Sequence, residues 1–139
     1  MICYMSELIQ NAVKITEDGV DTYLPSIHQH HYNLYTFKDG STYAVDGGNA
    51  YVRRGHSGNL EDKEIENYNL ESDFPFETIC EKLMWGSRGK SGKEKVKYLP
   101  FTMLEVDHLK SILDYNDKLS IHLSDLQIRV INHWISKKS

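Results

Sequence analysis

The sequence predicts an α+β fold, with an N-terminal antiparallel β-meander, a further hairpin and two C-terminal helices that pack in an oligomer. Before residue 54, Asp-Gly and Gly-Asn pairs separate short runs rich in β-branched and aromatic residues, which is typical of hairpins. After residue 100, apolar residues recur with helical spacing. A chain of 139 residues is long enough to bury one core, so we predict a single domain over 1–139.

The N-terminal half is expected to begin with one short helix and to continue as strands. The hydroxyl of Ser6 can accept a hydrogen bond from the first free amides of a helix over 7–12. Turn signals at Asp18-Gly19, Asp39-Gly40 and Gly48-Asn49 follow. They predict strands over 13–15, 20–24, 32–37, 41–45 and 50–53.

Residues 55–73 differ in composition from the flanking segments. They are acidic and rich in asparagine, and Lys63 is their only lysine or arginine. We expect a surface excursion that carries one short helix.

The C-terminal half is predicted to be mainly helical. Apolar spacing predicts a helix over 74–84, and a glycine–lysine loop then leads into a strand over 95–99. Thr102 and Glu105 match a capping box that opens a helix ending near Tyr115. A last helix is expected over 119–136, and its broad apolar face favours contact with a second subunit.

The glycine–lysine loop is the main candidate for binding chemistry. From Gly86 to Tyr98, five lysines and arginines stand against Glu94, a local charge of +4 in a chain whose net charge is −4. Trp85 precedes this loop, and an aromatic ring beside cations is a common way to hold a nucleotide. A nucleotide P-loop is excluded for two reasons. Met84 stands where that motif requires its first glycine, and a charged strand follows where the motif requires a helix. The pattern indicates either a phosphate-binding loop of another kind or a solvated hairpin turn.

A second basic pair, Arg53-Arg54, lies beside Tyr51. Guanidinium groups suit bidentate binding of phosphate, but such a pair can also serve solubility or an ion pair with the acidic stretch that follows. His28 and His30 would share one face of a strand, yet no further ligand stands nearby at metal-binding spacing. We therefore predict no metal site.

Enzyme motifs are not apparent in the sequence, and we expect no catalysis. Cys80 lies on an apolar helical stripe, which favours a structural thiol. Two distant cysteines favour free thiols in a reducing compartment. No apolar run approaches the ~18 residues that span a membrane, and residues 1–7 lack the pattern of a secretion signal.

Over most of residues 28–113 the chain resembles phage-encoded Thoeris anti-defence proteins of the first type. The segments that carry the resemblance are His30-His31-Tyr32, Phe37-Lys38-Asp39-Gly40, Val45-Asp46-Gly47-Gly48, Tyr51-Val52-Arg53-Arg54-Gly55, the stretch from Trp85 to Lys93 with Tyr98, and Asp107-His108-Leu109 with Ile112-Leu113.

The resemblance implies a non-enzymatic sponge without a cofactor, acting in the cytoplasm of an infected bacterial host. Members of this family bind the cyclic ADP-ribose isomer (glycocyclic ADP-ribose) that bacterial TIR-domain enzymes make, and sequester it without cleaving it. Some members also hold cyclic oligonucleotides. The family forms homo-oligomers, which implies a dimer or a hexamer with ligand pockets at subunit contacts.

The ligand-binding residues expected for this chain come from two sources. The matching motifs imply Arg53, Arg54, Trp85, Arg88 and Lys90, and chemistry alone adds Phe101, Asn116 and Arg129. The alternative function is a small phage nucleic-acid-binding accessory protein, because the tryptophan–glycine start of the loop also resembles WGR-type modules that bind DNA ends. Multiple phosphate contacts would give that alternative a steep salt dependence.

Overall fold

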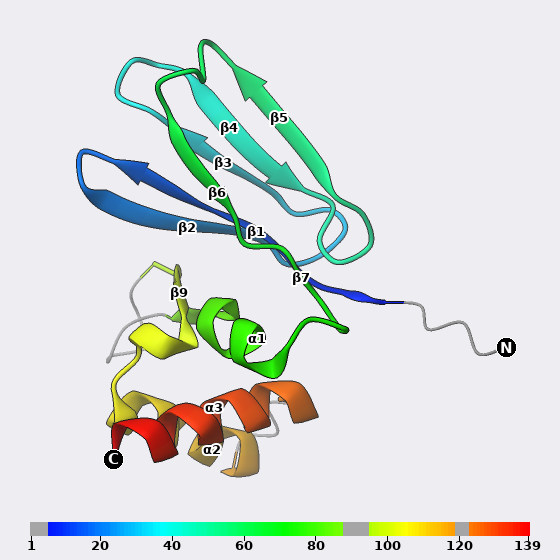
Figure 1. Cartoon of the computed structure of the whole chain (residues 1–139), viewed down its shortest axis with the longest axis vertical. Helices are drawn as coiled ribbons and strands as arrows, with labels where there is room; N and C mark the ends of the chain where they lie inside the picture. The colour runs from blue at the N-terminus through cyan, green and yellow to red at the C-terminus, as the bar shows by residue number, and fades with distance from the viewer. Residues whose placement is uncertain (1–5, 88–94, 119–122) are drawn as a thin grey trace, which may run out of the picture. The chain divides into compact units, whose positions relative to one another are not determined.

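The computed structural model describes residues 6–87, 95–118 and 123–139. The fold is α+β, with antiparallel sheets and three α-helices in the described residues (Figure 1). The packing groups the chain, predicted as a single domain over 1–139, into two compact units, Met1–Phe74 (unit 1) and Pro75–Ser139 (unit 2). Each unit is described by itself.

Strand β1 (Leu8–Glu17) organises the first sheet of unit 1. It pairs antiparallel with β2 (Val20–Ser26), β6 (Glu64–Asn67) and β7 (Leu70–Glu71). The β1–β2 hairpin closes through Asp18 and Gly19, both with positive φ (52° and 76°), the backbone that two-residue hairpin turns require. This predicted turn is confirmed.

The second sheet of unit 1 has the order β3 (Tyr32–Thr36), β4 (Thr42–Asp46), β5 (Arg53–Ser57). Both pairings are antiparallel, and the β3–β4 turn contains Gly40 with φ 88°. The strands predicted over 32–37 and 41–45 are confirmed. The strand predicted over 50–53 is displaced, because residues 50–52 lie in the β4–β5 loop and β5 runs from Arg53 to Ser57.

Apolar side chains from both sheets form one core in unit 1. Val13, Ile15 and Leu24 come from the first sheet, and Val45 and Phe37 come from β4 and the β3–β4 turn. All five are at most 5% exposed. The alternation of β3, in which Tyr35 faces the core while Tyr32 and Leu34 are exposed, follows from the period of two along a strand.

Two predictions for unit 1 are wrong. Residues 8–12 form the start of β1 instead of a helix, because the buried side chain of Asn11 and the amide of Ala12 bond to distant segments. The Ser6 hydroxyl donates to Asp73 (2.8 Å) and caps nothing. The acidic stretch likewise forms no helix: it contributes the end of β5 and strands β6 and β7, whose pairing with β1 supplies their backbone partners.

Unit 2 begins with helix α1 (Phe76–Lys82) and the hairpin of β8 (Met84–Ser87) and β9 (Lys97–Pro100). Both the predicted helix and the predicted strand are confirmed. The backbone amide of Phe101 donates to the carbonyl of Leu83 at 2.9 Å. This bond ties the end of the hairpin to the end of α1.

Two further helices complete unit 2: α2 (Val106–Lys118) and α3 (Asp125–Lys138). The capping box predicted at Thr102 is wrong, because residues 101–103 form a 3₁₀ turn and Leu104 is extended (ψ 143°) and buried. The box that exists caps α3, where Ser124 and Gln127 exchange hydrogen bonds. Helices α2 and α3 contact one another. Their buried apolar residues are Leu109, Ile112, Val130 and Ile131. No helix in the described ranges is long and apolar enough to span a membrane.

Candidate functional site

The two arginines of the Arg53-Arg54 pair lie in different environments. Neighbouring residues on a strand face opposite sides, and Arg54 faces the interior of unit 1. Its guanidinium donates to the side-chain oxygens of Asn11 and Asn69, the latter at 2.8 Å. Burial lowers the pKa of Arg54, and the nearby Tyr43 raises it by a smaller amount. Arg54 therefore joins β5 to β1 and to the segment before β7.

The carboxamides around Arg54 extend this contact into a network. Asn11 is fully buried, and its amide nitrogen donates to the carbonyls of Asp46 (2.8 Å) and Tyr51 (3.2 Å). The oxygen of Asn69 also accepts from the backbone amide of Ala12 (2.8 Å). We define these residues as the Arg54 network, and its role is to hold both sheets and the β4–β5 loop together.

Arg53 remains at the surface. Its guanidinium carbon lies 5.5 Å from the centroid of the Tyr51 ring, and its register partner on β4 is Asp46. The Tyr51 hydroxyl donates to the carbonyl of Gln29 at 3.2 Å. Of the predicted pair, Arg53 is thus the arginine whose donors are accessible to a ligand.

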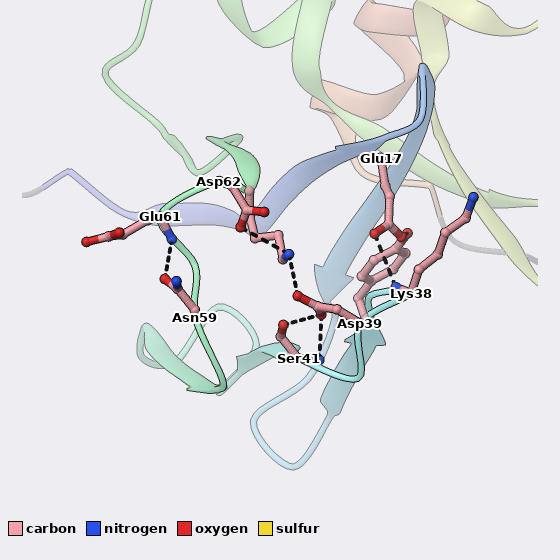
Figure 2. A network of polar contacts seen from close by, with 9 residues as sticks. Glu17, Lys38, Asp39, Ser41, Asn59, Glu61 and Asp62 are labelled. Carbon is pink, nitrogen blue, oxygen red and sulfur yellow. Dashed lines mark hydrogen bonds and ion pairs between the residues drawn. The ribbon is translucent and has the colours of Figure 1, made fainter.

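Asp39 belongs to a network of polar contacts in unit 1 (Figure 2). The Lys63 ammonium bonds to Asp39 (2.7 Å) and Asp62 (3.1 Å), and Asp39 also accepts from the amide and hydroxyl of Ser41. Lys63 and then Ser41 hold the pKa of Asp39 well below its usual range. The ion pairs of unit 1's described residues involve Lys38 and Lys63. An ion pair between Arg53-Arg54 and the acidic stretch, one of the alternatives above, is therefore not observed in the described part of unit 1.

In unit 2, the β8–β9 hairpin presents Trp85 on one face. The register pairs are Trp85 with Leu99 and Ser87 with Lys97, so Ser87 and Lys97 share that face with the indole. The Trp85 ring is half-buried against Phe101, with centroids 5.6 Å apart. Lys97 is exposed. The hairpin thus places an aromatic ring, a hydroxyl and a cation on one surface, which we call the Trp85 face.

Phe101 is fully buried beneath this indole. It supports Trp85 and has no exposed surface to offer a ligand. Arg129, on α3, stacks on Phe76 with its guanidinium carbon 4.6 Å from the ring centroid, and Phe76 meets His133 edge-on at 5.8 Å. Arg129 is exposed, and stacking on a ring leaves the edge donors of a guanidinium available.

Three predicted ligand residues are not described. Arg88 and Lys90 lie outside the described residues. Cys3, which is not a predicted ligand residue, lies outside them as well. Asn116 lies in α2, but its side chain is outside the described part. These expectations stay predictions.

The histidine cluster lies in the β2–β3 connection rather than on a strand. His28 stacks on His31 at 5.3 Å, and His31 Nδ1 accepts from the backbone amide of Ile27 at 3.0 Å. Within the described ranges, no three His, Cys, Asp or Glu side chains gather as a metal site. Cys80 is buried in α1, and burial raises the pKa of its thiol.

Charge is divided between the two units. Unit 1 has five lysines and arginines against twelve aspartates and glutamates, whereas unit 2 has eleven against eight. The chain's acidity therefore resides in unit 1, and unit 2 is net cationic. Lys97 is not among the ligand-binding residues expected from the sequence, although strand alternation from Trp85 across the hairpin places it on the Trp85 face.

Compared with known proteins, the chain matches no family model, no curated protein and no solved structure.

Proposed function

We propose that this protein is a non-catalytic binder that sequesters a cyclic ADP-ribose isomer made by bacterial TIR-domain enzymes, in the cytoplasm of an infected host. The observation that carries the proposal is the Trp85 face, where an indole and the exposed Lys97 share one side of a hairpin in the cationic unit. The sequence resemblance supplies the ligand class.

The ligand has features that this surface suits. A cyclic ADP-ribose carries a diphosphate and a purine, and the Trp85 ring offers a surface on which a purine can stack. Lys97 offers a charge-assisted bond to the diphosphate. Unit 2 attracts anions by its net charge, whereas the acidic excess of unit 1 repels them.

Sequestration sets a minimum affinity. Half-saturation at ~1 μM ligand requires about −8 kcal/mol, and each tenfold gain in affinity requires about 1.4 kcal/mol more. A hydrogen bond to a charged group contributes about 1.5–3 kcal/mol, and stacking of a base on an aromatic side chain about 1–3 kcal/mol. A few such contacts reach the affinity that a sponge needs.

Titration calorimetry of the full chain with cyclic ADP-ribose isomers tests this proposal. Lys97→Glu should weaken binding by roughly tenfold or more, because it removes one charge-assisted bond and adds repulsion. Lys110→Glu is the matched control, since Lys110 is also exposed in unit 2 but lies on α2. Trp85→Phe keeps an aromatic ring over Phe101 and should weaken binding less than Trp85→Ala.

Two results would contradict the proposal. One is the absence of binding by any cyclic ADP-ribose isomer; the other is an equal loss in the Lys97 and Lys110 variants. A steep fall of affinity for DNA with salt, without binding of the nucleotide, would instead favour the nucleic-acid-binding alternative.

A further inference from the structure

Two side chains near the end of α3 bond to other elements of unit 2. Trp134 and Lys138 lie one turn apart and share a face, because residues i and i+4 are neighbours on an α-helix. The indole nitrogen of Trp134 donates to the carbonyl of Cys80 in α1 at 2.9 Å. The Lys138 ammonium lies 5.8 Å from the centroid of the Trp134 ring. Trp134 thus joins α3 to α1 and lies beside the Lys138 ammonium.

The Lys138 ammonium is bound by the connection between β9 and α2. It donates to the carbonyls of Thr102 (2.5 Å) and Leu104 (2.6 Å). These carbonyls belong to the 3₁₀ turn η1 (Phe101–Met103) and to the residue that follows it. An ammonium has three donors that rotate freely, so one lysine can serve both carbonyls. Charge-assisted bonds of this kind are roughly twice as strong as neutral ones. We call Lys138 with its two carbonyls the Lys138 clasp.

The clasp holds the backbone next to the side chain on which Trp85 rests. Phe101 is the first residue of η1, and its ring centroid lies 5.6 Å from that of Trp85. The Phe101 amide donates to the carbonyl of Leu83 (2.9 Å), and its carbonyl accepts from the amide of Leu104 (3.0 Å). Phe101 is fully buried, and a packed interior transmits small displacements. A shift of η1 would therefore move the Phe101 ring and the indole above it.

We propose that Lys138 is a positioning residue for the Trp85 face, acting through η1 and Phe101 on the orientation of the indole. This role rests on the proposed function, in which the Trp85 ring stacks on the purine of the ligand. The ligand then binds the clasped conformation more tightly than the unclasped one. Because such coupling is reciprocal, bound ligand also stabilises the clasp.

A purely structural role for Lys138 makes a different prediction. In that case, removal of the ammonium lowers the free energy of unfolding, but the folded molecules bind ligand as before. A positioning role predicts a change within the folded state, in which Trp85 occupies its binding position in only a fraction of the molecules. The apparent dissociation constant then rises by the reciprocal of that fraction.

Fluorine NMR of the full chain labelled with fluorotryptophan measures this fraction without any ligand. Trp85 and Trp134 are the only tryptophans, so two resonances are expected, and Trp85→Phe assigns them. Lys138→Met keeps an unbranched side chain without the charge, and should shift and broaden the Trp85 resonance. Relaxation dispersion of that resonance gives the displaced fraction. Lys138→Arg, which keeps donors for both carbonyls, should largely restore the wild-type resonance.

Matched variants separate the clasp from the charge and from folding. Lys137→Met removes the neighbouring lysine, which is also exposed in the last turn of α3, and should leave the Trp85 resonance unchanged. Circular dichroism and urea denaturation show whether each variant is folded. Lys138→Gln, which keeps a neutral donor, replaces Lys138→Met if the methionine variant does not fold.

Titration calorimetry with cyclic ADP-ribose isomers completes the test. Lys138→Met should weaken binding by about threefold to tenfold, in agreement with the displaced fraction, whereas Lys137→Met should bind like wild type. An unchanged Trp85 resonance in Lys138→Met would overturn the inference, and so would a shifted resonance with unchanged affinity. Wild type that binds no isomer would contradict the proposed function instead, and the resonance without ligand would still decide whether Lys138 positions Trp85.

Discussion

Replacement of Arg54 by alanine tests whether the basic pair is divided between structure and surface. In the Arg54 network, the guanidinium donates to Asn11 and Asn69. Asn11 is fully buried, so its oxygen would lose its donor where water does not reach it. A buried acceptor without a partner costs about 1–3 kcal/mol. With the lost bond to Asn69, which keeps the amide of Ala12, we expect a destabilisation of about 2–4 kcal/mol.

Arg53→Ala is the matched control, because it removes the neighbouring residue of the same type. Arg53 is exposed and contacts the ring of Tyr51, and an exposed cation–π pair contributes about 0.5–1 kcal/mol. The free energy of unfolding should therefore fall by less than about 1 kcal/mol.

Urea denaturation gives both values, and hydrogen exchange locates the effect. Trp85 and Trp134, the only tryptophans, are in unit 2, so tryptophan fluorescence is a poor probe of unit 1. Amide exchange in β1 and β5 should accelerate in the Arg54 variant and change little in the Arg53 variant. Equal stability of the two variants would refute the structural role of Arg54.

Three further predictions concern the core, a pH-sensitive loop and a helix cap. Leu109→Ala should cost about 2–5 kcal/mol of stability in urea denaturation, because the side chain is fully buried, while exposed Met103→Ala should cost little; equal costs would contradict the packing. Burial and, to a smaller extent, His28 lower the pKa of His31 in the folded chain. As the pH drops below 6.5, the unfolded chain therefore binds a proton more readily than the folded chain, and stability should fall. His31→Asn should reduce this pH dependence, and an unchanged profile would contradict it. Ser124→Ala should cost about 1 kcal/mol and speed exchange in the first turn of α3, and unchanged exchange would count against the observed cap.

Turn and helix patterns in the sequence correctly predicted elements whose conformation depends on neighbouring residues. The turn at Asp18-Gly19 and the helix at Phe76–Lys82 were correct, because a positive-φ backbone and an apolar stripe are encoded by adjacent residues. The helix predicted after Ser6 failed because the start of β1 pairs with β7, more than 50 residues away, as Leu8 does with Glu71. The amide of Ala12 likewise bonds to distant Asn69. No pattern within residues 6–12 contains that information.

The candidate site shows the same division. The sequence predicted Arg53 and Trp85 as ligand-binding residues, and the structure places Arg53 at the surface and Trp85 half-buried. The same reasoning proposed Arg54 and Phe101 as ligand-binding residues, although Arg54 donates a hydrogen bond to Asn11 and Phe101 packs against Trp85. Strand alternation could have separated Arg53 from Arg54 in advance. Burial of Phe101 depends on the docking of the hairpin, which the sequence alone does not specify.

The most direct test of the proposed function is the identity of the nucleotide that the protein retains. The full chain is incubated with lysate from cells in which a TIR-domain enzyme is active, repurified and denatured by heat, and the released compound is identified by mass spectrometry. Sequestration predicts an intact cyclic ADP-ribose isomer, in reduced amount from the Lys97→Glu variant. Release of linear ADP-ribose, or of no nucleotide, would contradict it.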